Sequence, residues 1–209
     1  MRIALIHALK HSILPIEAAF AKLWPAASLM NLLDDSLSAD VARDGRITEA
    51  MTERFLRLGR YAAGTGADAI LFTCSAFGPC IEAVVREQAP LPVLKPNEAM
   101  IELAVGKGRR IGLLSTFAPT LASMPPEFPG SVVVVPKLAE GALAALDRGD
   151  RVGHDRLVAE ASKDLRDCDL IALAQYSMAP TASLVESASG RPVVTTPDSA
   201  VSKLKAMLG

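Results

Sequence analysis

The sequence repeats itself, and this internal repeat constrains the fold more than any other feature. RIALIHAL, which begins at Arg2, is matched 108 residues later by RIGLLSTF. ADAILFTCSAF, which begins at Ala67, is matched 101 residues later by CDLIALAQYSM. LPVLKPNEAM, which begins at Leu91, is matched 100 residues later by RPVVTTPDSA. Because the three pairs keep their order and nearly the same offset, we expect two similar halves of about 100 residues each.

Each half alternates short apolar runs with longer segments of helical periodicity. In residues 48–63, for example, apolar side chains recur at spacings of three and four residues, which is typical of a helix. The expected strands are residues 3–7, 69–73, 92–94, 110–115, 132–136, 170–174 and 193–195. The expected helices are residues 15–22, 48–63, 79–88, 97–105, 154–167, 180–189 and 199–208. This alternation predicts parallel sheets that are covered by helices on both faces.

We therefore predict an α/β fold of two pseudo-symmetric, three-layer αβα halves, with mainly parallel sheets and an active-site cleft between them. The first half is expected at residues 1–96 and the second at residues 97–196. The C-terminal helix, within residues 197–209, is expected to pack back on the first half. The charged stretch 34–45 is expected to be a solvated loop, with a lid over the active site as the alternative.

Composition excludes several classes of function. The net charge is −1, and no basic run or aromatic platform indicates binding to nucleic acid. No apolar stretch reaches the roughly 18 to 20 residues that span a bilayer, and the N-terminus lacks the pattern of a signal peptide, so we expect a cytoplasmic protein without membrane partners. Three cysteines form no disulfide framework and no metal-ligand spacing with the histidines. No metal or organic cofactor is expected, and a homo-oligomer is compatible with the sequence.

Polar or reactive residues stand where the expected strands end. In open parallel sheets, ligands bind beyond the carboxyl ends of the strands. Four of these ends carry His7, Cys74, the pair Ser115 and Thr116, and the pair Gln175 and Tyr176. Under the offset of 101 residues, Cys74 in the first half corresponds to Gln175 in the second.

Cys74 is the candidate catalytic residue of this set. It stands at an expected strand-to-helix turn, and we expect the helix N-terminus to favour the thiolate, so that Cys74 ionises more readily than a free cysteine. Candidate substrate-binding groups are the backbone and side chains around this turn and the hydroxyls at the other strand ends: His7, Ser12, Thr73, Ser75, Ala76, Ser115 and Thr116. Cys80 and Cys168 are expected to be structural.

The chain resembles the aspartate/glutamate/hydantoin racemase superfamily, which also includes enzymes of the arylmalonate decarboxylase and maleate isomerase types. The resemblance spans the chain and rests on the repeat, on Thr73-Cys74-Ser75-Ala76, on Ser115-Thr116 and on LAQYSMAP. It implies a cofactor-independent enzyme with one cysteine on each half. One thiolate removes the Cα proton of a small carboxylate or hydantoin, and the opposing thiol returns a proton. This sequence departs from that pattern, because Gln175 stands where the second cysteine is expected.

A glutamine amide donates and accepts hydrogen bonds but does not act as a base near neutral pH. Three interpretations therefore stay open. The chain is a racemase or isomerase, with Tyr176 or a water serving the face opposite Cys74. Alternatively, it is an arylmalonate-type decarboxylase, in which Cys74 is the single proton donor and the product has the opposite hand, because that type keeps its cysteine on the second half. In the third interpretation the protein binds a small carboxylate without turning it over, or Cys74 is a nucleophile.

Overall fold

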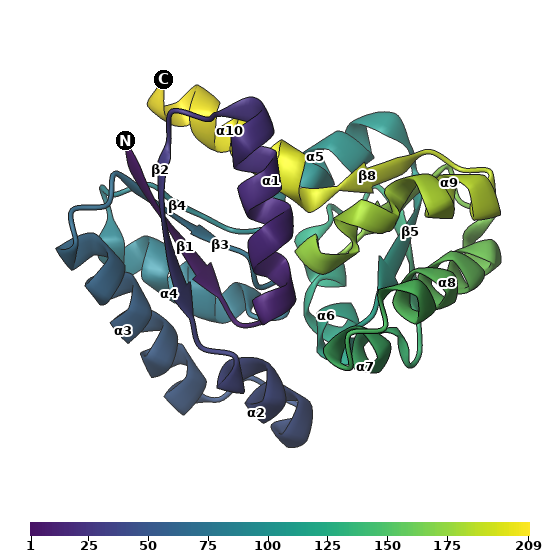
Figure 1. The fold of residues 1–209 in the computed structure, drawn as a ribbon, viewed down its shortest axis with the longest axis horizontal. Coiled ribbons are helices and arrows are strands. Elements are labelled where there is room, and N and C mark those ends of the chain that lie inside the picture. Colours follow the sequence, from purple (N-terminus) through teal and green to yellow (C-terminus); the bar gives the residue numbers. More distant parts are fainter.

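Two four-stranded parallel sheets form the framework of the protein. The structure is a computed structural model that describes residues 1–209, and its two lobes lie side by side (Figure 1). The first sheet has the order β2-β1-β3-β4 and the second the order β6-β5-β7-β8. Their bounds are β1 Arg2–His7, β2 Ser28–Leu33, β3 Ala69–Phe72, β4 Val93–Leu94, β5 Arg110–Ser115, β6 Val133–Leu138, β7 Leu170–Leu173 and β8 Val193–Thr195. The identical strand order confirms the two-fold repeat.

Helices cover both faces of each sheet, which confirms the predicted α/β fold of two three-layer halves. The α-helices are α1 Ile13–Leu23, α2 Ser36–Asp44, α3 Glu49–Gly64, α4 Gly78–Gln88, α5 Glu98–Lys107, α6 Ala118–Ser123, α7 Ala142–Asp147, α8 Arg151–Ser162, α9 Ala182–Ser189 and α10 Thr196–Leu208. Four 3₁₀ helices join them: η1 Lys10–Ser12, η2 Pro125–Glu127, η3 Lys163–Leu165 and η4 Tyr176–Thr181.

The alternation of side chains along β1 shows how the first half is held together. Ile3 and Leu5 point to one face of the sheet, where they pack with residues of α1 and α10. Ala4 and Ile6 point to the other face, where they pack with residues of α3 and α4. Because successive residues of a strand face opposite sides, every residue of this central strand from Ile3 to Ile6 is buried. A strand that is buried on both faces reads as a continuous apolar run, and this is why β1 is visible in the sequence.

The chain returns from the second sheet to the first lobe through α10. Ala200, Val201 and Leu204 on this helix are buried in the same cluster as residues of β1 and α1. In Figure 1, α10 (yellow) accordingly lies beside α1 near the N-terminus, although almost the whole sequence separates them. The first core is therefore built from both ends of the chain.

Two elements differ from the sequence-based prediction. Residues 34–45 were expected to form a solvated loop, and this is wrong, because they contain the helix α2. Leu37 and Val41, four residues apart, are buried in the core of the first half, and this amphipathic spacing stabilises the helix. Strand β2 was not predicted at all. It lies at the edge of its sheet and is only partly buried, so its sequence lacks a continuous apolar run.

Candidate active site

Residues from both lobes line a small cavity at the carboxyl ends of the central strands. The lining residues are Ala8, Leu9, Ser12, Ser38, Thr73, Cys74, Ser75, Ala76, Phe77, Phe117, Thr120 and Gln175. The predicted site residues Ser12, Thr73, Cys74, Ser75, Ala76 and Gln175 are thus brought together. Residues of this set that sequence reasoning missed include Ser38 and Thr120, because neither stands directly at the end of a predicted strand.

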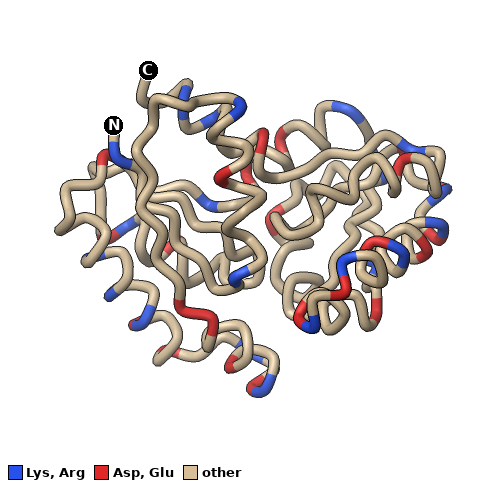
Figure 2. Tube along the Cα trace, in the orientation of Figure 1, with Lys and Arg blue, Asp and Glu red and all other residues tan.

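No Asp, Glu, Lys, Arg or His lines this cavity. Figure 2 shows charged residues gathered along outer helices such as α3 and α8. Among the lining residues, Cys74 is the only one whose side chain ionises as an ordinary acid or base. Among the lining side chains, Cys74 is therefore the candidate acid or base.

Cys74 lies just beyond the end of β3 and is 7 % exposed. Its sulfur accepts a hydrogen bond from the backbone N–H of Ala8, with an N···Sγ distance of 2.9 Å. The thiol can donate to the carbonyl oxygen of Ile6, 3.5 Å away. Both partners belong to the end of β1 and the turn after it, so the parallel pairing of β1 with β3 positions the thiol.

The expected lowering of the Cys74 pKa is wrong. Burial raises the pKa of the Cys74 thiol to about 12, because the thiolate loses its hydration inside the protein. The hydrogen bond from Ala8 lowers this pKa but does not offset the effect of burial. Helix α4 begins only at Gly78, four residues after the thiol, and the dipole effect is confined to about the first turn of a helix. A base must therefore accept the thiol proton before Cys74 can act as one.

Gln175 occupies the corresponding tip of the second lobe in one fixed orientation. Its Oε1 accepts three hydrogen bonds: from the backbone N–H of Thr116 at 2.7 Å, the Thr116 hydroxyl at 2.9 Å and the Ser115 hydroxyl at 2.9 Å. The backbone donor identifies the accepting atom as the oxygen, because an amide nitrogen does not accept. Gln175 Nε2 has no partner within the protein and is not among its fully enclosed polar atoms. The side chain therefore offers N–H donors to the cavity.

Ser115 and Thr116 do not line the cavity, contrary to their predicted contact with substrate. Both hydroxyls lie 2.9 Å from Gln175 Oε1, and the Ser115 hydroxyl proton is shared with the Phe117 carbonyl oxygen at 3.0 Å. Tyr176 was expected to line the cleft, but its side chain is packed in the core of the first half. Its hydroxyl donates to the carbonyl oxygen of Pro96 at 3.4 Å, and burial raises its pKa above the ordinary value. Tyr176 is therefore poorly suited to act as a base.

His7 also lies outside the cavity lining, although it was expected to contact an anion. The imidazole is fully buried, and both of its nitrogens are occupied. Nδ1 lies 2.7 Å from the Thr73 hydroxyl, and Nε2 lies 2.9 Å from the side-chain oxygen of Asn31. Burial lowers the pKa of His7, because desolvation penalises the imidazolium. No ring nitrogen is left to bind a substrate.

The two lobes close over the cavity, which measures only about 20 Å³. This volume holds about one water molecule. Contacts between the lobes at the cavity include the Ser75 and Thr120 hydroxyls at 3.1 Å and the Ser123 hydroxyl, which donates to the Ser75 carbonyl oxygen at 3.3 Å. At the rim, His11 Nε2 lies 2.7 Å from Asp147 Oδ1 of the other lobe. A substrate can enter only if the lobes separate or the lining side chains move.

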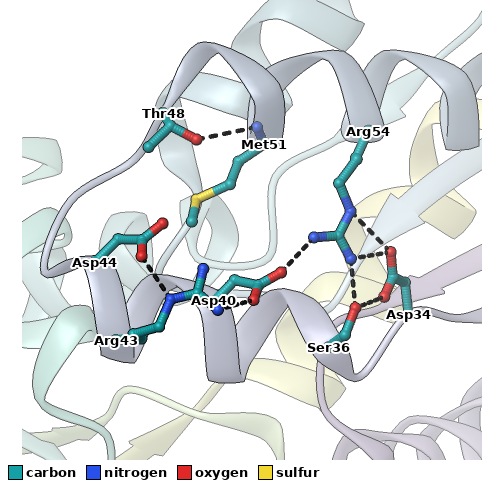
Figure 3. Close-up of polar contacts among 8 residues, drawn as sticks. All are labelled: Asp34, Ser36, Asp40, Arg43, Asp44, Thr48, Met51 and Arg54. Atoms are coloured by element: carbon teal, nitrogen blue, oxygen red, sulfur yellow. Dashed lines mark hydrogen bonds and ion pairs between the residues drawn. The ribbon is translucent and has the colours of Figure 1, made fainter.

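Helix α2 borders the cavity through Ser38 and is fastened to the first lobe by ion pairs. Arg54 of α3 binds Asp34 and Asp40, each with a shortest N···O distance of 2.6 Å (Figure 3). Arg43 adds pairs to Asp40 and Asp44 within α2. These ion pairs fix the start and middle of α2 against α3. Ion pairs and buried side chains together therefore stabilise a helix in a segment that was expected to be a loop.

None of the helices combines the length and the hydropathy of a membrane-spanning segment. The family model for Asp/Glu/hydantoin racemases matches residues 16–204. A comparison with curated proteins found no match.

Solved racemase structures share the fold. Glutamate racemase from Francisella tularensis, in complex with D-glutamate, is 14 % identical with a TM-score of 0.79, covering 99 % of this chain and 80 % of the other. Allantoin racemase from Klebsiella pneumoniae is 18 % identical with a TM-score of 0.76, covering 100 % and 87 %. Aspartate racemase from Picrophilus torridus is 13 % identical with a TM-score of 0.71, covering 99 % and 94 %. Because the family model matches nearly the whole sequence, the chain belongs to the Asp/Glu/hydantoin racemase family.

Proposed function

We propose that this protein is a cofactor-independent racemase or isomerase that moves a proton at the carbon alpha to a carboxylate or ring carbonyl, with Cys74 as the catalytic thiol. One observation carries the proposal: Cys74 is the only group in the cavity lining that ionises as an ordinary acid or base. The proton on such a carbon is weakly acidic, so its removal needs a base on one face and donors for the charge that forms on oxygen.

Gln175 is suited to stabilise that charge. Its amide oxygen is held by Ser115 and Thr116, so its N–H groups are directed away from these partners and are available to a substrate oxygen. Donors that are already in place cost no reorganisation when the enolate forms. In this proposal Gln175 is an electrostatic partner of the reaction and not a second base. The opposite face of the substrate then receives its proton from water.

The substrate carries no ammonium group in this proposal. A free amino acid would bring an ammonium into a cavity whose lining has no acidic side chain, and burying an unpaired charge is costly. A neutral ring, or a single carboxylate held by hydroxyls and amide N–H groups, fits this lining better. A hydantoin-like ring meets this condition, and a monosubstituted malonate meets it once loss of CO₂ has left a single carboxylate.

An apolar substituent on the substrate is favoured by the surroundings of the cavity. A larger cavity of about 750 Å³ adjoins it, since Ala76 and Phe117 line both. Its walls include Val41, Ile47 and Pro119, with Arg46 as its one charged residue. Apolar walls of this kind gain from covering an alkyl or aryl group.

Decarboxylation is a second candidate, and the presence of a single thiol favours it. Loss of CO₂ from a malonate leaves an enediolate, which needs one proton on one face. Cys74 could supply that proton without a partner on the opposite lobe. A two-base racemase needs an acid or base on each face, and the second lobe offers Gln175 in that place.

Incubation in D₂O distinguishes these reactions. Enantiomerically pure 5-substituted hydantoins and aryl- or alkylmalonates are incubated with the protein and followed by NMR and chiral chromatography. A racemase introduces deuterium at the alpha carbon of the remaining substrate pool. A decarboxylase labels only the product and releases CO₂. Cys74→Ala abolishes either activity, whereas Cys80→Ala, which removes a thiol outside the cavity, retains it.

Substrate binding without turnover in the wild-type protein would support the non-catalytic interpretation. Binding is measured by calorimetry with the wild type and Cys74→Ala. Full turnover by Cys74→Ala would refute the proposed role of the thiol.

A further inference from the structure

A chain of four side chains runs from the protein surface to the neighbourhood of Cys74. Glu17 of α1 accepts a hydrogen bond from Asn31 Nδ2 at 2.8 Å. Asn31 of β2 lies with Oδ1 2.9 Å from His7 Nε2, and His7 Nδ1 lies 2.7 Å from the Thr73 hydroxyl. We call Glu17, Asn31, His7 and Thr73 the His7 chain. Three secondary-structure elements contribute to it, and only Thr73 reaches the cavity lining.

The direction of each hydrogen bond follows from the chemistry of the groups. The Glu17 carboxylate only accepts, so it binds the amide nitrogen of Asn31 and turns the amide oxygen toward His7. That oxygen also only accepts, so His7 carries its proton on Nε2. In the neutral imidazole Nδ1 is then a bare acceptor. The Thr73 hydroxyl therefore donates its proton to His7 Nδ1.

The hydroxyl of Thr73 and the thiol of Cys74 lie side by side. Both reach the carbonyl oxygen of Ile6, with Thr73 Oγ1 at 3.4 Å and Cys74 Sγ at 3.5 Å. A hydrogen bond from the Thr73 hydroxyl is also among the influences that favour the Cys74 thiolate. Since the hydroxyl proton is used by His7 in the resting state, its free lone pairs are available to accept from the thiol.

We propose that His7 exchanges protons with Cys74 through the Thr73 hydroxyl, and that Asn31 and Glu17 position His7 for this exchange; the inference rests on the proposed role of Cys74. The S–H bond breaks as its proton passes to Thr73 Oγ1. At the same time, the O–H bond of Thr73 breaks as its proton passes to His7 Nδ1. The products are a thiolate that accepts from the new Thr73 hydroxyl proton and an imidazolium that donates to Asn31. The reverse transfer restores the thiol.

The charges around the His7 chain match this exchange. Glu17 is the acidic group that acts on His7, and its negative charge favours the imidazolium through Asn31. Asp34 acts on Cys74 and disfavours the thiolate, but Arg54 is bound to that carboxylate (Figure 3). The His7 chain thus supplies a base for the buried thiol. His7 can take the thiol proton without hydroxide entering the cavity.

The pH dependence of Cys74 alkylation tests the exchange without any substrate. The wild type is treated with iodoacetamide between pH 5 and 10, and the rate at Cys74 is followed by peptide mass mapping. Thiolate formed through His7 requires neutral His7, so the rate rises to an inflection below pH 6.5 and then stays level until direct loss of the thiol proton to solvent overtakes it at higher pH. In His7→Gln this level region is absent: the alkylation rate rises about tenfold per pH unit across the range and is lower than the wild-type rate at pH 7.

Glu17→Gln is the second variant. It leaves the buried imidazole in place, and the new amide oxygen can still accept a hydrogen bond from Asn31. Loss of the Glu17 charge moves the inflection to lower pH, a change that a purely structural role would not produce. Identical profiles in wild type and His7→Gln would overturn the proposal, and if His7→Gln does not fold, an unmoved inflection in Glu17→Gln would do so. If the protein turns over a substrate but its Cys74 alkylation profile shows no inflection, only the proton exchange with His7 is refuted. If the alkylation profile shows the inflection but no substrate is turned over, only the proposed function is refuted.

Discussion

Glu127 makes the stability of this protein depend on pH near neutrality. Its carboxyl group lies at the contact between the lobes, where Asn97 Nδ2 donates to Oε1 at 3.4 Å. A Cβ built on Gly78, the first residue of α4, would lie 3.2 Å from the same oxygen. Burial raises the pKa of Glu127 from 4.5 to about 7, against the opposing charge of Lys95. The folded protein therefore binds this proton more tightly than the unfolded chain does.

The sign and size of the effect follow from that difference. The stabilisation by bound proton is fully present below pH 4.5 and is lost as the pH rises through about 7. A tenfold difference in proton affinity corresponds to about 1.4 kcal/mol, so the whole loss amounts to about 3 kcal/mol. Glu127→Gln imitates the protonated carboxyl group and removes the titration.

Urea unfolding at pH 5 and pH 8.5 measures this contribution. Glu127→Gln should exceed the wild-type free energy of unfolding by less than about 1 kcal/mol at pH 5 and by about 3 kcal/mol at pH 8.5. Glu140→Gln, which makes the same change in charge at an exposed site, serves as the control. If Glu127→Gln changed the free energy of unfolding by the same amount at both pH values, the reasoning would be refuted.

Two further predictions concern packing and the cavity. Gly59→Ala should lower the free energy of unfolding by about 1 to 3 kcal/mol, because its Cβ would lie 2.5 Å from Val84 Cγ1 of α4. Gly64→Ala on the same helix meets no atom within 4 Å and should leave urea unfolding unchanged or slightly improved. Gln175→Glu keeps an oxygen for the donors of Ser115 and Thr116 but replaces the N–H donors with a second oxygen. Its turnover should fall about 100-fold or more, and an unchanged kcat would show that Gln175 does not stabilise the enolate.

The repeat, together with the alternation of strands and helices, predicted the main features of the framework. β1 and β5 are 108 residues apart in the chain and are each the second strand of their sheet. The edge strands β2 and β6 obey the same repeat at an offset of 105 residues, but sequence reasoning missed β2. A half-exposed edge strand tolerates polar residues such as Asn31, so its pattern is weak. The same exposure places Asn31 where it can join Glu17 to His7.

The sequence by itself determined that Cys74 and Gln175 stand at equivalent strand ends, since the period of a strand and the offset of a repeat are local properties of the chain. Only the tertiary structure decided what surrounds these residues there. Thr116 fixes which end of the Gln175 amide faces the cavity. Burial raises the pKa of Cys74, and His7 at the end of β1 is fully buried outside the cavity lining. Hydrogen-bond direction and desolvation depend on neighbours far away in the sequence, so no local pattern could have revealed them.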